Sequence, residues 1–323
     1  MFYAIRHFTR YRYSRPVWQT VMEARMHPRT ENNQRCFTFQ LAVKPRARIF
    51  SYTDHLGNLV HHFDIPSDHT QLTILADALV DVTSPPEVPQ SLGSGAWREL
   101  ERMLEADDYW DMLMPSRFGR SSSDLEALAR ELGVDERAGR DPLELALSIN
   151  GAIARTFAYL KKSTKVDSPI EVALAARSGV CQDFAHIMIS LLRNLRIPSR
   201  YVSGYLFYAQ ESEMEHGATH AWVEALMPGL GWVGFDPTHD QLVRDQHIRT
   251  AVGRDYADVP PTWGTMKGSA MTELQVRVRV TPSDAVLPPD QEFAADEEWS
   301  RVLEKDQQAE EMLAQAQQQQ QQQ

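Results

Sequence analysis

The chain has 323 residues and a formal net charge of −11 at pH 7, with 42% hydrophobic and 24% charged residues. These values are typical of a folded globular protein and exclude collagen-like, disulfide-scaffold and largely disordered classes. The acidic charge and the lack of a basic stripe argue against nucleic acid as the main partner, because phosphate binding requires clustered Lys and Arg. The sequence contains no apolar run of about 18 residues, the length that would predict a membrane span.

The N-terminal residues alternate apolar and cationic side chains, which is not typical of a secretion signal. We therefore expect a cytoplasmic protein that binds neither a membrane nor nucleic acid. Its two cysteines, Cys36 and Cys181, are too few for a disulfide framework and should stay reduced in that compartment. Each cysteine must then be judged by its sequence context.

Residues 1–83 predict a small β-sandwich. They contain short segments rich in β-branched and aromatic residues, which prolines separate at regular spacing. A turn near Gly57 predicts a hairpin within residues 52–60. The other expected strands lie at residues 2–5, 20–26, 36–41 and 72–75.

Residues 84–140 are predicted to be a linker and a helical insert, because a proline-rich stretch opens this region and helical signals follow it. Ser123 and Glu126 predict a capping box for a helix that Gly133 ends. A second helix is expected from residue 142, where a proline follows an aspartate. These signals mark a change from strands to helices along the chain.

The clearest helix is predicted at residues 181–196, where apolar residues recur at i, i+3, i+4 and i+7 before Pro198. The pattern then changes to the alternation typical of strands. Residues 272–280 alternate most regularly and are expected to complete a sheet, in either part of the protein. The strands expected between these segments lie at residues 200–207, 220–226 and 232–236.

We therefore predict an α+β protein, in which an N-terminal β-sandwich accompanies a core whose long helix packs on an antiparallel sheet. The core is expected at residues 141–282. Residues 283–323 are acidic and end in consecutive glutamines, which predicts a partly helical or disordered tail.

Cys181 lies at the first turn of the long predicted helix, within the segment RSGVCQD (177–183). A thiol at this position faces unpaired backbone N–H groups and the positive end of the helix dipole, which favour the thiolate. Gly179 permits a close approach of the chain to the sulfur. The context indicates a nucleophile, and a buried structural cysteine is the alternative.

His220 and Asp236 lie on two strands that flank a turn at residues 227–229. If the antiparallel pairing is centred on residue 228, the two side chains are directly opposed on one face, at a Cβ separation of about 5 Å. A carboxylate at this distance can orient an imidazole, which then accepts the thiol proton. A slip of one residue would place the two side chains on opposite faces.

Three sequence blocks carry these residues: GVCQDFA (179–185), THAWVE (219–224) and WVGFDPT (232–238). They resemble the signature blocks of the transglutaminase-like (papain-like) superfamily, in the same order and spacing. The segments RHFTRYRY (6–13) and GRDYADVPP (253–261) are similar to bacterial members that carry an N-terminal β domain. The resemblance covers roughly residues 1–82 and 145–281.

The resemblance implies a papain-like transglutaminase core with Cys181 as nucleophile, His220 as base and Asp236 as orienting acid. A thioester formed from an amide would be released by water or by an amine, and we favour peptidase or amidase activity over transamidation. The expected substrate is a peptide or protein amide. No cofactor and no metal are expected.

Two other functions stay open. A catalytically idle binding module on the same fold would dock a protein partner through the N-terminal β domain or the acidic tail. A zinc hydrolase would use His216 and His220, although the sequence places no helix and no third ligand there.

Three further residues receive structural interpretations. Asp183 is predicted to complete the cap of the helix that begins at Cys181, with a role near the substrate as the alternative. His239 is interpreted as part of a loop turn, with an influence on the Cys181, His220 and Asp236 group as the alternative. Cys36 lies in an alternating strand and is predicted to be an inert core thiol.

Overall fold

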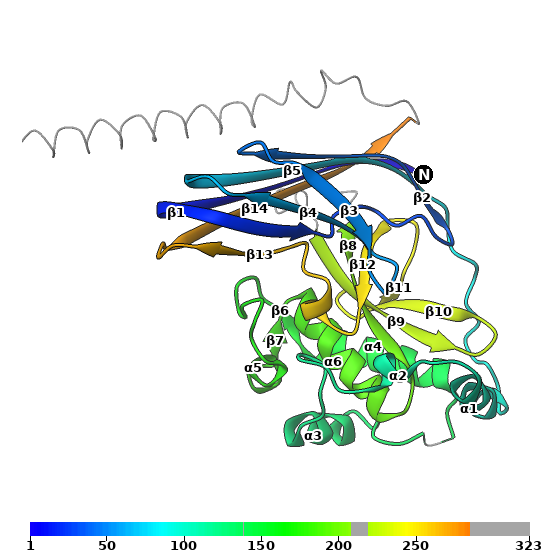
Figure 1. Cartoon of the computed structure of the whole chain (residues 1–323). Coiled ribbons are helices and arrows are strands. Elements are labelled where there is room, and N and C mark those ends of the chain that lie inside the picture. The colour runs from blue at the N-terminus through cyan, green and yellow to red at the C-terminus, as the bar shows by residue number, and fades with distance from the viewer. Residues whose placement is uncertain (138, 208–218, 285–323) are drawn as a thin grey trace, which may run out of the picture. The chain divides into compact units, whose positions relative to one another are not determined.

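The computed structural model describes all residues except 138, 208–218 and 285–323, and Figure 1 shows its strands and helices. Residues 1–282 form one unit, and a second unit begins at Ser283. The expected character of the tail therefore concerns residues that lie almost wholly outside the described part. Within the described part, no helix is both long and apolar enough to cross a bilayer.

The N-terminal residues supply five strands, in the order β2-β5-β1-β4-β3, to a seven-stranded sheet, and two later strands within residues 262–283 also pair with β1. Residues 272–280, which were expected to complete a sheet, belong to one of these two strands. The seven strands are β1 (Phe2–Ala24), β2 (Gln34–Lys44), β3 (Ile49–Thr53), β4 (Leu59–Ile65), β5 (His69–Val82), β13 (Thr262–Lys267) and β14 (Thr272–Ser283).

The long strand β1 belongs to two layers. Its first half pairs with β5 and its second half pairs with β4 and β13, with a shift of register between Arg12 and Val17. The two strands predicted at residues 2–5 and 20–26 are therefore one strand. Phe63 from β4 and Ile74 from β5 lie in the same apolar cluster, so the layers face each other across one core, as in a sandwich.

Of the six helices in the described part, three begin at or next to the residues that the sequence predicts, and the other three were not predicted individually. The cap of α3 is Ser122, one residue before the predicted Ser123, and its side chain accepts the Leu125 N–H. Asp141 and Glu144 form a capping box at the start of α4, with proline at the first helical position. The helices are α1 (Ala96–Ala106), α2 (Trp110–Leu113), α3 (Ser123–Glu131), α4 (Pro142–Thr156), α5 (Ile170–Ala176) and α6 (Cys181–Asn194), and a 3-10 turn follows at Tyr256–Asp258.

An antiparallel five-stranded sheet with the order β11-β10-β9-β8-β12 forms the centre of the second part. Val223 of β9 lies in one apolar cluster with Ile187 of α6, so the helix covers one face of this sheet. Ile248 of β12 packs instead with Tyr3 of the N-terminal layer. The strands are β8 (Ser199–Leu206), β9 (Thr219–Met227), β10 (Gly231–Asp236), β11 (Gln241–Leu242) and β12 (His247–Gly253), and a parallel pair, β6 (Ala158–Tyr159) and β7 (Ser178–Gly179), precedes α6.

The register of the β9–β10 hairpin differs from the prediction by two residues. Met227 pairs with Gly231 and Val223 pairs with Phe235, so the pairing is centred on residue 229. The cause is the turn, in which Gly229 adopts φ +74° and Gly231 adopts φ +73°, which leaves a three-residue loop. The prediction that His220 and Asp236 lie directly opposite each other is therefore wrong. Because side chains alternate with a period of two, both still lie on the same face.

Arg193 connects α6 to three other segments. All five of its N–H groups donate hydrogen bonds, so this buried guanidinium has no unpaired donor. It therefore fixes the helix that carries Cys181 relative to the insert and to β8. The acceptors are the carbonyl oxygens of Met112, Met114, Ser199 and Arg254 and the hydroxyl oxygen of Ser116, at 2.7–3.1 Å.

A substitution at Gly204 tests the close packing of β8 against β12. A Cβ atom there would collide with the carbonyl oxygen of Ile248 and with the ring of Trp222. Because β12 is paired to β8 along its length, the backbone cannot withdraw, and we expect Gly204→Ala to lower the free energy of unfolding by about 1–3 kcal/mol. Chemical denaturation measures the loss. Gly95→Ala is the control, since a Cβ there meets nothing within 4 Å, and equal stability of the two variants would contradict the packing described.

Candidate active site

Cys181 is the first residue of α6 and is a free, partly buried thiol. The start of the helix is fixed by Asp183, whose Oδ2 accepts the Val180 N–H at 2.8 Å and the Thr164 hydroxyl at 2.6 Å. A Cβ atom on Gly179 would lie 2.8 Å from the same oxygen, so glycine allows this close approach. Asp183 therefore has the capping role that the sequence predicts.

His220 and Asp236 are in direct contact. The Nε2 atom of His220 lies 2.9 Å from Oδ2 of Asp236, and both side chains are buried. The side chain of Cys181 also interacts with His220, so the imidazole contacts both the thiol and the carboxylate. Since Nε2 is engaged by Asp236, Nδ1 is the nitrogen left for the thiol. The structure thus brings the three predicted site residues together.

The charges of this group are mutually dependent. Burial disfavours the imidazolium form of His220, but the Asp236 carboxylate and the contact with Cys181 outweigh it and raise the pKa of His220 to about 10. Burial also disfavours the ionised form of Asp236, yet the pKa of this carboxyl is held well below its usual range by His220 and by two further histidines. The site therefore favours an imidazolium beside a carboxylate at neutral pH.

Two histidines that were not predicted as site residues also contact Asp236. His239 Nδ1 lies 2.8 Å and His247 Nε2 lies 3.2 Å from the same Oδ2 atom. His239, interpreted as part of a loop turn, is close in sequence, and its spacing of three from Asp236 was the available signal. His247 begins β12 and reaches the site only through the pairing of β12 with β8, which no local pattern reveals.

His220, Asp236 and His247 also have donor atoms within 4.8 Å of one another, as in many metal centres. A metal on Nε2 of His247 would require a proton on Nδ1. That nitrogen instead accepts the backbone N–H of Arg244 at 3.2 Å, so the two protons would clash. The hydrogen-bond pattern fits a proton-sharing cluster better than a metal centre. His216, the other candidate ligand, lies outside the described residues.

Two tryptophans near the site and the second cysteine have structural surroundings. Trp222 is fully buried, with its ring 6.2 Å from that of His220, and Trp232 packs under the guanidinium of Arg200 at 4.3 Å. Cys36 donates its S–H to the Thr38 carbonyl oxygen at 3.3 Å, and burial raises the pKa of its thiol to about 11. A thiol with this pKa is a weak nucleophile near neutral pH.

Two families match the chain. Residues 3–81 match the "Bacterial transglutaminase-like N-terminal region", and residues 126–237 match the "Transglutaminase-like superfamily". The second match contains Cys181, His220 and Asp236.

Similar proteins cover most of the chain. An uncharacterized protein of Mycobacterium leprae is 32% identical over 278 residues, which are 85% of this chain and 96% of that one. An uncharacterized protein of Mycobacterium tuberculosis is 33% identical over 292 residues, 87% of this chain and 92% of that one. A protein-glutamine gamma-glutamyltransferase of Pseudomonas aeruginosa is 27% identical over 213 residues, 60% of this chain but 30% of that one.

A crystal structure has the same fold. It is that of a candidate cysteine protease from Cytophaga hutchinsonii, with a TM-score of 0.67 and 24% sequence identity, and the match covers 88% of this chain and 92% of that one. The shared fold extends over the N-terminal sheet as well as the helix-and-sheet core.

The raised pKa of His220 predicts how stability depends on pH. Protonation of His220 stabilises the fold fully below its unfolded pKa of about 6.5, and this contribution is lost as the pH rises through about 10. Asp236→Asn removes the carboxylate that favours the imidazolium. We expect its free energy of unfolding to vary less between about pH 7 and pH 10 than that of the parent.

Urea denaturation at several pH values measures this difference, with Cys181→Ala in both proteins so that ionisation of the thiol does not contribute. Asp240→Asn is the control, because this carboxylate is exposed. Parallel pH curves for Asp236→Asn and its parent would contradict the pairing of Asp236 with a protonated His220.

Proposed function

The chain belongs to the transglutaminase-like superfamily, and on that premise we propose that it is a cysteine-dependent acyl-transfer enzyme acting on amide bonds. The observation that supports this most is that His220 contacts both the thiol of Cys181 and the buried carboxylate of Asp236. A nucleophile, a base and an orienting group in contact are what thioester chemistry requires.

In the proposed reaction, the thiolate of Cys181 attacks the carbonyl carbon of an amide and forms a C–S bond. The oxygen becomes negative and accepts the backbone N–H of Cys181, which has no acceptor within the first turn of the helix. His220 then gives the proton on Nδ1 to the amide nitrogen, and the C–N bond breaks. The products of this step are a thioester on Cys181 and a free amine.

The second step returns the thiolate. His220, now neutral, takes a proton from an incoming nucleophile as that nucleophile attacks the thioester carbon. Water gives a carboxylic acid, whereas an amine gives a new amide. We propose hydrolysis as the main outcome and transamidation as its alternative, and the named relatives include one of each kind: a candidate cysteine protease and a glutamyltransferase.

The substrate that we propose is an amide in a peptide or protein. The alternative function is a binding module in which the same residues stay idle. Because the carboxylate of Asp236 is buried, ionised and hydrogen-bonded to three histidines, it is better explained by a role in proton transfer than by a role in docking.

A thioester intermediate gives the test. The full chain is incubated with an unfolded protein substrate and a labelled primary amine, quenched in acid and examined by mass spectrometry. We expect an acyl adduct on Cys181 and cleaved or deamidated substrate, with amine incorporation as a minor product. Cys181→Ser should abolish the adduct and the products, while Cys36→Ser should leave both unchanged.

The outcomes separate the alternatives. Amine incorporation in excess of hydrolysis would favour transamidation by the same site. Unchanged substrate with the parent protein, together with full biological function in Cys181→Ala, would overturn the enzyme proposal in favour of the binding module.

A further inference from the structure

His247 is the first residue of β12, and its ring is buried against Asp236. Its tautomer is fixed by two contacts. The backbone N–H of Arg244 donates to Nδ1 at 3.2 Å, so the proton of the neutral ring is on Nε2 and points to Asp236 Oδ2 at 3.2 Å. Burial lowers the pKa of His247, although the carboxylate opposes this, so the ring is a neutral donor.

The hydrogen bond that His247 donates to Asp236 contributes most when His220 is neutral. While His220 is an imidazolium, the charge of Asp236 is balanced by it. When His220 gives its proton to a leaving group, the buried carboxylate of Asp236 loses the charge of that imidazolium, and a buried charge with less compensation is costly. The N–H of His247 stabilises that state more than it stabilises the ion pair.

We propose that His247 is a positioning residue, which holds Asp236 in place and favours proton release from His220, and that the N-terminal region keeps His247 in register. This inference rests on the proposed function of Cys181, His220 and Asp236. His247 does not itself touch the reacting atoms.

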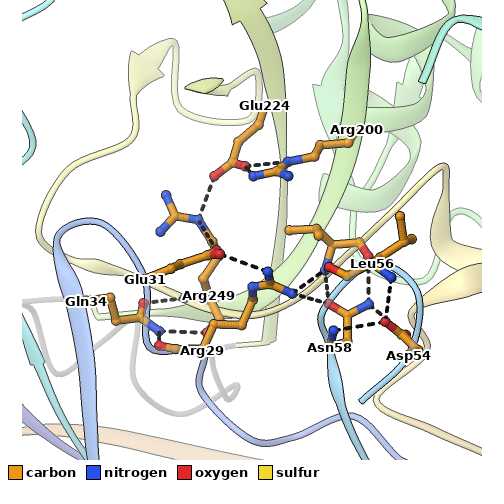
Figure 2. Close-up of polar contacts among 10 residues, drawn as sticks. Arg29, Glu31, Gln34, Asp54, Leu56, Asn58, Arg200, Glu224 and Arg249 are labelled. Atoms are coloured by element: carbon orange, nitrogen blue, oxygen red, sulfur yellow. Dashed lines mark hydrogen bonds and ion pairs between the residues drawn. The ribbon is translucent and has the colours of Figure 1, made fainter. Parts of the chain in front are cut away.

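Side chains of the N-terminal region hold β12 by hydrogen bonds of the kind that a neighbouring strand would make. β12 is the last strand of its sheet, so one side of its backbone has no strand partner there. Gln34 accepts the Arg249 N–H at 2.7 Å and donates to the Arg249 carbonyl oxygen at 2.9 Å. Asn58 does the same with Val252, at 2.8 Å for both bonds (Figure 2 shows Gln34 and Asn58 among these contacts). Two side-chain amides thus make the backbone hydrogen bonds that two residues of a paired strand would otherwise make.

The side chains around this strand also link it to the strand of His220. Arg249 Nε donates to Glu224 Oε1 at 2.6 Å, and Arg200 Nε donates to Glu224 Oε2 at 2.8 Å (Figure 2). Glu224 lies on β9, four residues after His220, and β8 separates it from β12. The ion pairs therefore fix the spacing between the strands that carry the two histidines.

The titratable groups that face His247 are few. They are Asp236, His220, with ring centroids 6.1 Å apart, and His239, whose proximity also disfavours a charged His247. The indole of Trp222 covers the ring edge at 5.3 Å. A substitution at His247 should therefore act chiefly on the charge balance of the Asp236–His220 pair.

The test measures the pKa of His220 by imidazole nitrogen NMR in the full chain carrying Cys181→Ala, so that the thiol does not titrate. We expect His247→Phe to raise this pKa by about one unit, because the neutral state of His220 loses the donor that stabilises its carboxylate. His247→Gln should restore the parent value, since its amide can reach Asp236. If the Phe variant does not fold, His247→Asn keeps an acceptor for Arg244 but cannot reach the carboxylate.

His7→Phe is the matched control, because His7 is also buried and contacts Tyr205 rather than Asp236. A pKa of His220 that is the same in the parent and in His247→Phe would overturn this inference and leave the proposed function intact. A parent in which His220 titrates near 6.5 would overturn the ion pair and this inference with it, whereas the proposed function fails only if the thioester on Cys181 does not form.

The strand contact is tested separately. Gln34→Leu removes the amide that pairs with Arg249, and we expect it to shift the pKa of His220 in the same direction as His247→Phe, by a smaller amount. Gln40→Leu, at an exposed position of the same strand, should cause no shift. Equal values for the Gln34 and Gln40 variants would overturn the role assigned to the N-terminal region.

Discussion

One oxygen atom, Oδ2 of Asp236, organises the candidate site. It accepts N–H groups from three histidines, while Oδ1 accepts the backbone N–H of Thr238 at 3.0 Å. A buried carboxylate without such donors would cost several kcal/mol and would take up a proton instead. Because the donors come from β9, from the turn after β10 and from β12, the site is complete only when the whole core sheet has formed.

The same constraint extends to Cys181, the proposed nucleophile. His220 can stay protonated in a buried place only because Asp236 is charged, and the thiol of Cys181 interacts with the same ring. The cap at Asp183 and the five donors of Arg193 fix the helix that carries this thiol. The geometry therefore depends on a sheet and a helix that are each held by buried polar groups with satisfied partners.

Local patterns predicted the parts of the site that depend on local physics. The helix that begins at Cys181 has a strong apolar period, and the hairpin places His220 and Asp236 on one face even though the register is shifted by two residues. The shift came from the Gly229–Gly231 turn, whose loop length was not evident from composition. His247 was missed because its contact arises from the pairing of β12 with β8, between segments far apart in the chain.

The N-terminal region was equally hard to predict in detail. Its strands were expected, but the pairing of β13 and β14 with β1 links the two ends of residues 1–282 in one sheet. Its role was left open by the sequence. The contacts of Gln34 and Asn58 with β12 suggest that it supports the core by covering a sheet edge, which would otherwise be free to pair with another chain.

The central claim is that His220 makes Cys181 a nucleophile. The most direct measurement is the rate of Cys181 alkylation by iodoacetamide as a function of pH, in the full chain with Cys36→Ser. The account predicts rapid alkylation that persists well below about pH 8 and slows strongly in His220→Ala. Slow alkylation that rises only near about pH 8.5 and is unchanged by His220→Ala would contradict it.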